Sequence, residues 1–451
     1  MVVDLNIVNA KILLQDQLFS GGVSIENGEI VKVGKQTNLL RSSDEIDAQG
    51  AALLPGLVDP HVHLRDMDLA YKEDFYTGTC AAVAGGYTTV LEMPNTMPMT
   101  DSAARLREKI EVAERSIIAN VGFFSAFPAS FQEFSSIASE GAVGFKEHLH
   151  KIWGALNITD NATLSRAIRE STKVNLPVAF HAEDKATVEE IEEKLTSDGK
   201  SSIEDYLTAH SEEAELSAVD SVIQCLNERS KVHFCHVSLP DTVGMIAEAR
   251  SQGYWISCEI TPHHLLLSEE SIQSLRGFAI TAPPLRRKEY RNDLWSLLVN
   301  GQIDAVATDH APHTETEKKT GNVWQVPPGV PGLETSLSLF LDRVARGQID
   351  LSRLSALMSA RPCSLFNLQK KGLVWNGFDA DLVLVNLKAS YRIDASKFQS
   401  RAKFSPFDGR LVFGKVLKTF VQGIPVYEDD EVVAKRGTGK IVRQRKDQLE
   451  E

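Results

Sequence analysis

The sequence has few cysteines, no long apolar run and no excess of positive charge. Five cysteines among 451 residues are too few, and odd in number, for a disulfide framework. The opening segment MVVDLNIVNAKILL lacks the basic-then-apolar order of a signal peptide, and no apolar run approaches the length that spans a membrane. We therefore expect a soluble cytoplasmic protein.

The charge balance is acidic. A formal net charge of -13 argues against nucleic acid or an anionic membrane as the main partner. The one dense basic run, Lys435 to Lys446, lies in a polar stretch and is interpreted as a solvated end. The length allows one large α/β domain and a smaller one beside it.

The two ends of the chain share a pattern that the centre lacks. Residues 1–54 and residues 373–440 both consist of short strand-like segments separated by turns. This pattern predicts one small β-sandwich domain built from both ends. The centre, residues 55–372, would form the second domain, and residues 441–451 a polar tail.

The central segment alternates short apolar runs with helical patterns, and eight of the apolar runs are candidate strands. Continuous apolar runs are typical of buried parallel strands, so we expect an α/β fold, a (β/α)8 TIM barrel. Such barrels place their chemistry at the carboxyl ends of the strands. Seven polar residues fall at or just after these ends: His61, His63, Asn95, Lys146, His181, His236 and Asp309.

Five of these residues suit a metal. His61 and His63 are two positions apart on a strand and point to the same side. Alone the pair is weak evidence, because barrel mouths often hold ordinary histidines. Together with His181, His236 and Asp309 it makes a set of imidazoles and one carboxylate that fits zinc or another borderline divalent ion.

Lys146 does not fit such a set as an ammonium, because a cation would repel the metal. It could be a salt-bridging or snorkelling side chain. Alternatively, carbamylation by CO₂ would give it two oxygens able to bridge metals about 3.5–4 Å apart. Residue chemistry alone leaves both interpretations open.

Several motifs together resemble the amidohydrolase superfamily and, within its cyclic amidases, the dihydroorotases. They are DPHVHLRD, EMPNT, GFK, HAED, CHVS, ATDHAPH and PPGVPGLET. The resemblance implies two Zn²⁺ per chain, the first held by His61, His63 and Asp309, and the second by His181 and His236. It also implies that carboxylated Lys146 bridges them and that Asp309 is the catalytic base and acid.

The resemblance also implies a binding site for carbamoyl aspartate and dihydroorotate, the reactants of a step in pyrimidine biosynthesis. Arg65, Asn95 and His313 would hold the substrate carboxylate, with Pro328 and Gly329 touching the ring through their backbone. Asn95 as a turn residue and His313 as a loop cap are the alternatives. A homodimer and an association with aspartate transcarbamoylase are compatible with the resemblance.

The match departs from the family at Ala282, where many bacterial dihydroorotases have Asn. Allantoinase-like sequences share this feature, so an allantoinase or hydantoinase is one alternative, and a catalytically inactive scaffold is another. Cys235 and Glu259 could touch a third metal, although Cys235 is more typical of a buried filler. His148 and His150, in EHLHKIWG after Lys146, could be extra metal ligands or part of a lid, but we expect them to face solvent in a loop. The segment 313–332 is interpreted as a functional loop over the barrel mouth.

Overall fold

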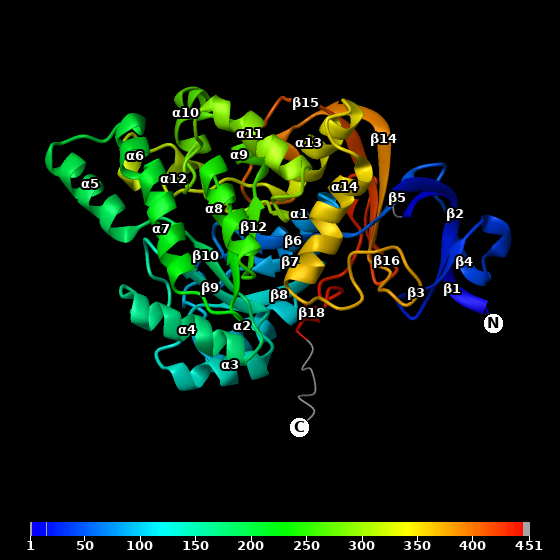
Figure 1. Cartoon of the computed structure of the whole chain (residues 1–451). Coiled ribbons are helices and arrows are strands. Elements are labelled where there is room, and N and C mark those ends of the chain that lie inside the picture. The colour runs from blue at the N-terminus through cyan, green and yellow to red at the C-terminus, as the bar shows by residue number, and fades with distance from the viewer. Residues whose placement is uncertain (1, 15, 445–451) are drawn as a thin grey trace.

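The computed structural model describes residues 2–14 and 16–444, and its larger part is a parallel barrel (Figure 1). The strands pair in chain order, and a bridge between Val62 and His310, with the His63 amide donating to the His310 carbonyl at 2.8 Å, joins the last strand end to the first. The eight predicted strands and the TIM barrel are therefore confirmed. The strands are β6 (Leu57–Val62), β7 (Tyr87–Glu92), β8 (Asn120–Ser125), β9 (Gly144–His148), β10 (Val178–His181), β11 (Lys231–Phe234), β12 (Trp255–Ile260) and β13 (Ala305–Val306).

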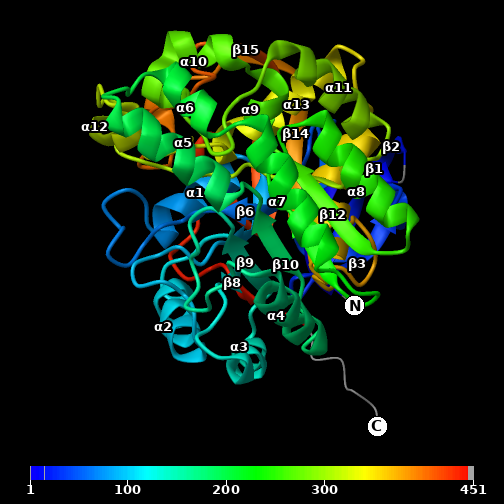
Figure 2. The same ribbon diagram turned by 60° about the vertical axis from the view of Figure 1, so that its left-hand side comes forward.

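Helices follow the strands and surround the barrel, as Figure 2 shows. Several begin at a residue whose side chain accepts a hydrogen bond from the third amide of the helix, as Asp74, Ser102 and Asp160 do. The helices are α1 (Phe75–Ala84), α2 (Ala103–Glu114), α3 (Phe134–Glu140), α4 (Asn161–Lys173), α5 (Lys185–Ser197), α6 (Ile203–Ala209), α7 (Glu212–Gln224), α8 (Pro240–Ser251), α9 (Pro262–Leu266), α10 (Glu269–Leu275), α11 (Lys288–Val299), α12 (Glu315–Lys318), α13 (Leu333–Ala345), α14 (Leu351–Ser355) and α15 (Arg361–Leu365).

The two chain ends fold together, as predicted, but in one connected sheet of mixed direction. β1 can pair with three strands because its register shifts between Ile7 and Ala10, where Asn9 has a φ of 52°. The sheet order is β17-β16-β15-β14-β5-β1-β2-β3, with β4 on β1. The strands are β1 (Val2–Leu14), β2 (Gln17–Glu26), β3 (Glu29–Gly34), β4 (Arg41–Asp47), β5 (Ala52–Pro55), β14 (Leu382–Arg392), β15 (Leu411–Val421), β16 (Ile424–Glu428) and β17 (Glu431–Val432).

The chain after residue 440 differs from the predicted polar tail. β18 (Ile441–Val442) pairs in parallel with β8, and Val442 is only 9% exposed. The Gln444 side-chain amide donates to the carbonyls of Val143 and Phe366, both at 3.0 Å. Residues 441–444 therefore lie against the barrel, and the rest of the predicted tail, 445–451, lies outside the described residues. Among the described residues, no helix is long and apolar enough to cross a membrane.

Candidate active site

His61, His63 and Asp309 meet at one end of the barrel. The Nε2 atoms of His61 and His63 lie 3.4 and 3.1 Å from the same oxygen of Asp309. On their other side, His61 donates from Nδ1 to Glu259 at 2.6 Å, and His63 donates from Nδ1 to Asn95 at 2.7 Å. These tautomers leave two Nε2 lone pairs facing a carboxylate, which is an arrangement that needs a cation.

The charged groups around His61 also indicate a cation at this position. Burial opposes its charged form, but the neighbouring Cys235, Asp309 and Glu259 outweigh it and raise the pKa of His61 to about 10. For Asp309, burial again opposes the charge, and His61 and His63 nevertheless lower its pKa below the usual value. The site therefore favours positive charge between these groups, and the donor set fits a zinc ion there.

A second pair of imidazoles lies beside the first group. His181 donates from Nε2 to Glu183 at 2.6 Å, so its Nδ1 is free, and that atom lies 3.2 Å from Nε2 of His236. The Nδ1 atom of His236 is buried and has no hydrogen-bond partner among the described residues. Two converging imidazole nitrogens suit a second zinc ion.

Lys146 is fully buried on β9 between these two groups, at 0% exposure. Its Nζ lies 3.1 Å from the Cys235 thiol and 5.7 Å from the centre of the Trp153 ring. No carboxylate of the described chain forms an ion pair with it, which removes the salt-bridge interpretation. Because an uncompensated buried ammonium costs several kcal/mol, conversion to a carbamate anion fits this position.

Cys235 and Glu259, the residues that could touch a third metal, lie beside His61, and Glu259 accepts from it on the side away from Asp309. With His61 they bring three potential ligand atoms within 4.8 Å of one another. Cys235 is buried, as expected of a small side chain that fills space in the core. Its sulfur nevertheless faces the polar amine of Lys146. Glu259 accepts from His233 at 3.0 Å as well as from His61, so it also orients a predicted ligand.

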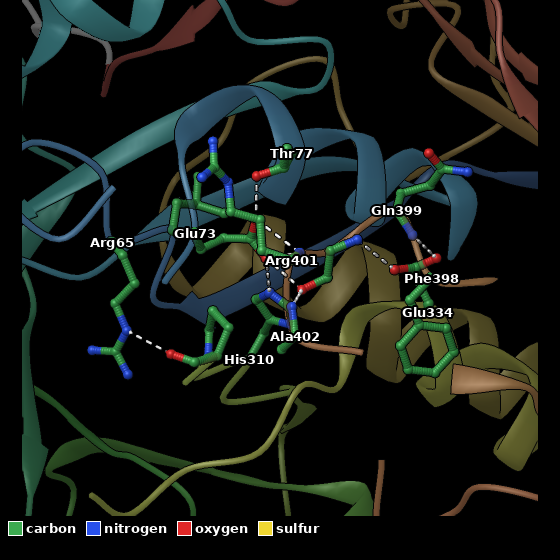
Figure 3. Close-up of polar contacts among 12 residues, drawn as sticks. Arg65, Glu73, Thr77, His310, Glu334, Phe398, Gln399, Arg401 and Ala402 are labelled. Carbon is green, nitrogen blue, oxygen red and sulfur yellow. Dashed lines mark hydrogen bonds and ion pairs between the residues drawn. The ribbon is translucent and has the colours of Figure 1, made fainter. Parts of the chain in front are cut away.

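Arg65 lies at the edge of the same site, where three consecutive residues adopt a positive φ, 60° at Arg65 itself. Figure 3 shows Arg65 beside the polar network around Glu73. The Glu73 carbonyl accepts from the Asp66 amide at 3.0 Å, and its carboxylate accepts from the Arg401 amide at 3.2 Å and from the Ser400 hydroxyl. This buried anchor joins the arginine segment to the chain between β14 and β15.

Arg65 is only 7% exposed, and its guanidinium forms no ion pair with any carboxylate of the described chain. Its Nε donates to the Pro312 carbonyl at 3.3 Å, and its Nη2 lies 3.1 Å from Nε2 of His313. Lys72 approaches the other nitrogen of His313 at 3.1 Å. Burial, reinforced by Arg65, Lys318 and Lys72, lowers the pKa of His313 well below its usual value, so this imidazole is neutral.

These side chains enclose a cavity of about 240 Å³. Pro328 and Gly329 form one wall, and Gly329 is required there because its φ is 133° and an added Cβ would lie 2.6 Å from Ala311. All the residues predicted for metal and substrate line it, together with Ala282, His148 and three that the sequence did not single out for it: Lys151, Trp153 and Ala311.

His148 and His150 do not face solvent, and that expectation is wrong. They are 9% and 3% exposed, and the His148 ring stacks on His181 with centroids 3.6 Å apart. The segment after β9 turns inward because Glu147 accepts from the amides of Phe127, Trp153 and Gly154. The segment 313–332 contains a short helix, α12, and a 3-10 turn at Val323–Gln325, where no regular element was expected.

The model of the amidohydrolase family matches residues 52–426. A dihydroorotase of Methanosarcina acetivorans is 34% identical over 97% of this chain and 95% of its own length. An L-hydantoinase of Paenarthrobacter aurescens is 31% identical over 98% of both chains. The solved structure of an L-hydantoinase (dihydropyrimidinase) from Arthrobacter aurescens superposes with a TM-score of 0.94 at 30% identity, covering 98% of this chain and 100% of that one.

Proposed function

Because the chain belongs to the amidohydrolase family, we propose that it is a cytoplasmic, zinc-dependent dihydroorotase. It would interconvert N-carbamoyl-L-aspartate and L-dihydroorotate plus water in pyrimidine biosynthesis. The observation that supports this substrate is the unpaired, buried guanidinium of Arg65 beside the metal-type ligands. Both reactants have a carboxylate remote from the reacting amide, whereas hydantoin and allantoin have none.

The carboxylate would occupy the corner between Arg65 and His313. A guanidinium binds a carboxylate through two parallel hydrogen bonds, which fixes the orientation of the substrate as well as its position. The same carboxylate would pair directly with a buried guanidinium that forms no ion pair with any carboxylate of the described chain. Backbone at Pro328 and Gly329, on the opposite wall, would then limit how the ring can turn.

In the hydrolytic direction, two zinc ions bridged by carboxylated Lys146 would supply an activated water and polarise the scissile carbonyl. His61, His63, His181, His236 and Asp309 would hold them. Asp309 would take the proton from the attacking water and deliver it to the departing ring nitrogen. The lowered pKa of Asp309 keeps it in the carboxylate form. Ring closure would use the same residues in reverse order.

A hydantoinase is the second candidate, and Ala282 is the observation that favours it. Ala282 lines the cavity where an asparagine amide would otherwise reach the substrate, and an L-hydantoinase is among the similar proteins. A scaffold without activity is disfavoured, because each predicted metal ligand is present and lines one cavity.

A direct comparison of substrates tests the proposal. The zinc-loaded protein would be assayed with L-dihydroorotate, hydantoin and allantoin under one set of conditions. We expect turnover of dihydroorotate with the highest kcat/KM of the three. Preference for hydantoin or allantoin would contradict dihydroorotate as the substrate. Metal-loaded protein that turns over none of the three would favour an inactive scaffold.

A further inference from the structure

A further group of potential metal ligands lies next to the active site, and none of its members has a step in the mechanism above. His150, Glu183 and His210 bring one ligand atom each within 4.8 Å of one another. The three residues are 3%, 0% and 5% exposed. They come from the loop after β9, the loop after β10 and the end of α6. We propose that these residues form an additional site for a divalent metal of the zinc type.

The carboxylate of Glu183 divides its two oxygens between two neighbours. One oxygen accepts from Nε2 of His181 at 2.6 Å, and the other lies 2.8 Å from Nδ1 of His210. The first oxygen orients a predicted ligand of the catalytic pair, as carboxylates beside zinc-binding histidines do. The second oxygen is the one that can bind a further metal.

A hydrogen bond between His210 and Glu183 would explain their distance without a metal, but it would leave His150 unexplained. The buried His150 ring forms no side-chain hydrogen bond with any described residue, and its centroid lies 5.6 Å from that of His210. Ligands of a tetrahedral zinc at about 2.0–2.1 Å lie roughly 3.3 Å apart, so the His210–Glu183 pair would open by about half an ångström. A metal accounts for all three residues.

A cavity beside the three residues provides space for further ligands of the metal. His150 and His210 line this cavity of about 350 Å³, and so do Glu192, Tyr206 and Trp324. Water in this cavity could complete the coordination, and Glu192 places a second carboxylate on its wall. Two imidazoles, a carboxylate and water form a donor set that zinc commonly adopts in proteins.

A metal at this site would act on the catalytic cavity through two connections. It would tie His150 to α6, which fixes the loop that contributes Lys151 and Trp153 to the catalytic wall. Through Glu183 it would also fix the orientation of His181. The site itself does not depend on which cyclic amide is the substrate, so it can fail while the proposed function stands.

Zinc stoichiometry of the full chain tests the site. The protein would be stripped with a chelator, dialysed against Zn²⁺ with bicarbonate present, and analysed for zinc per chain. The variants are His150→Gln, His210→Gln and the double variant. Cys235→Ser is the control, because it removes a ligand from the other group that could take an extra metal. Thermal unfolding of each variant shows whether it has folded.

We expect each histidine variant to bind one zinc fewer than the wild type, and the double variant to lose no more than either alone. Anomalous scattering from a zinc-loaded crystal should then give a peak between His150, Glu183 and His210. Equal stoichiometry in the wild type and in His150→Gln would overturn the site. So would loss of zinc in His210→Gln but not in His150→Gln, because that result would mean that His210 acts only through Glu183 on the catalytic pair.

Discussion

Nη2 of Arg65 lies 3.1 Å from Nε2 of His313, and both atoms are hydrogen-bond donors. His313 is neutral, its Nδ1 accepts from Lys72 at 3.1 Å, and its Nε2 therefore carries the proton and faces the Pro328 carbonyl at 3.0 Å. The contact between Arg65 and His313 is thus not a hydrogen bond. Because the Nε2–H of His313 is directed at the Pro328 carbonyl, Nη1 and Nη2 of Arg65 have no acceptor among the described residues, which leaves a position for an anionic oxygen.

This relationship gives a prediction for Arg65→Gln. The variant should lower kcat/KM for dihydroorotate by at least about 100-fold, which is roughly 3 kcal/mol, since it removes a charge-assisted pair of hydrogen bonds. Bound zinc, measured by elemental analysis, should not change. The matched control is Arg105→Gln on the exposed face of α2, which should retain full activity. Loss of zinc in Arg65→Gln would show that Arg65 supports the metal site rather than the substrate.

A second prediction concerns the buried amine of Lys146. Lys146→Met keeps an apolar stem of similar length but cannot form a carbamate, so it should bind less zinc and lose activity. Its unfolding temperature without metal should not fall, because the change removes a buried amine that has no anionic partner. In the wild type, ¹³C-bicarbonate should give a carbamate signal by NMR. Full zinc loading of Lys146→Met would contradict the bridging role.

A third prediction separates proton transfer from folding at Asp309. Asp309→Asn should lower kcat by about 10²–10⁴-fold, the usual range for loss of a general base and acid. The variant should remain folded, because the asparagine amide can donate to the Nε2 lone pair of His63, which lies 3.1 Å from the carboxylate in the wild type. Steady-state kinetics and circular dichroism on the same sample would check both points. A folded variant with unchanged kcat would remove Asp309 from the mechanism.

The sequence predicts the barrel and most of the site because both depend on short-range patterns. Continuous apolar runs define the strands, and the polar residue that ends each run, such as His181 at the end of β10, must lie at the barrel mouth. The burial of His150 could not be predicted in this way, since its loop has no periodicity and turns inward through backbone bonds to Glu147. The burial of Val442 could not be predicted either, because β18 has only two residues and lies in a polar stretch of the sequence.

A fourth prediction addresses the position where the sequence departs from many dihydroorotases. Ala282 lines both the catalytic cavity and the neighbouring cavity of about 350 Å³. Ala282→Asn would place an amide at this boundary and should lower KM for dihydroorotate by adding a hydrogen bond. Activity on substituted hydantoins should fall because the larger side chain reduces the room in the catalytic cavity. Ala282→Val, of similar bulk without the amide, is the control, and an equal effect of both variants would mean that size alone matters here.

The fifth prediction concerns Lys318, which anchors the loop over the barrel mouth. Its Nζ donates to the carbonyls of Ile280, Pro327 and Gly329 at 3.2, 2.9 and 2.9 Å. Burial, with repulsion from Arg65, lowers the pKa of Lys318 to about 7. In the unfolded chain the lysine keeps its proton up to a pH of about 10.4.

Between these two pKa values the unfolded chain binds more protons than the folded one, so the free energy of unfolding should rise with pH. The wild type should therefore gain stability relative to Lys318→Met from about pH 7 to about pH 10, by up to about 1.4 kcal/mol per pH unit. Urea unfolding at several pH values measures this difference. Lys319→Met, at an exposed neighbour paired with Glu315, should show no such trend. A constant difference for Lys318→Met would mean that the three carbonyls keep Lys318 protonated in the folded protein.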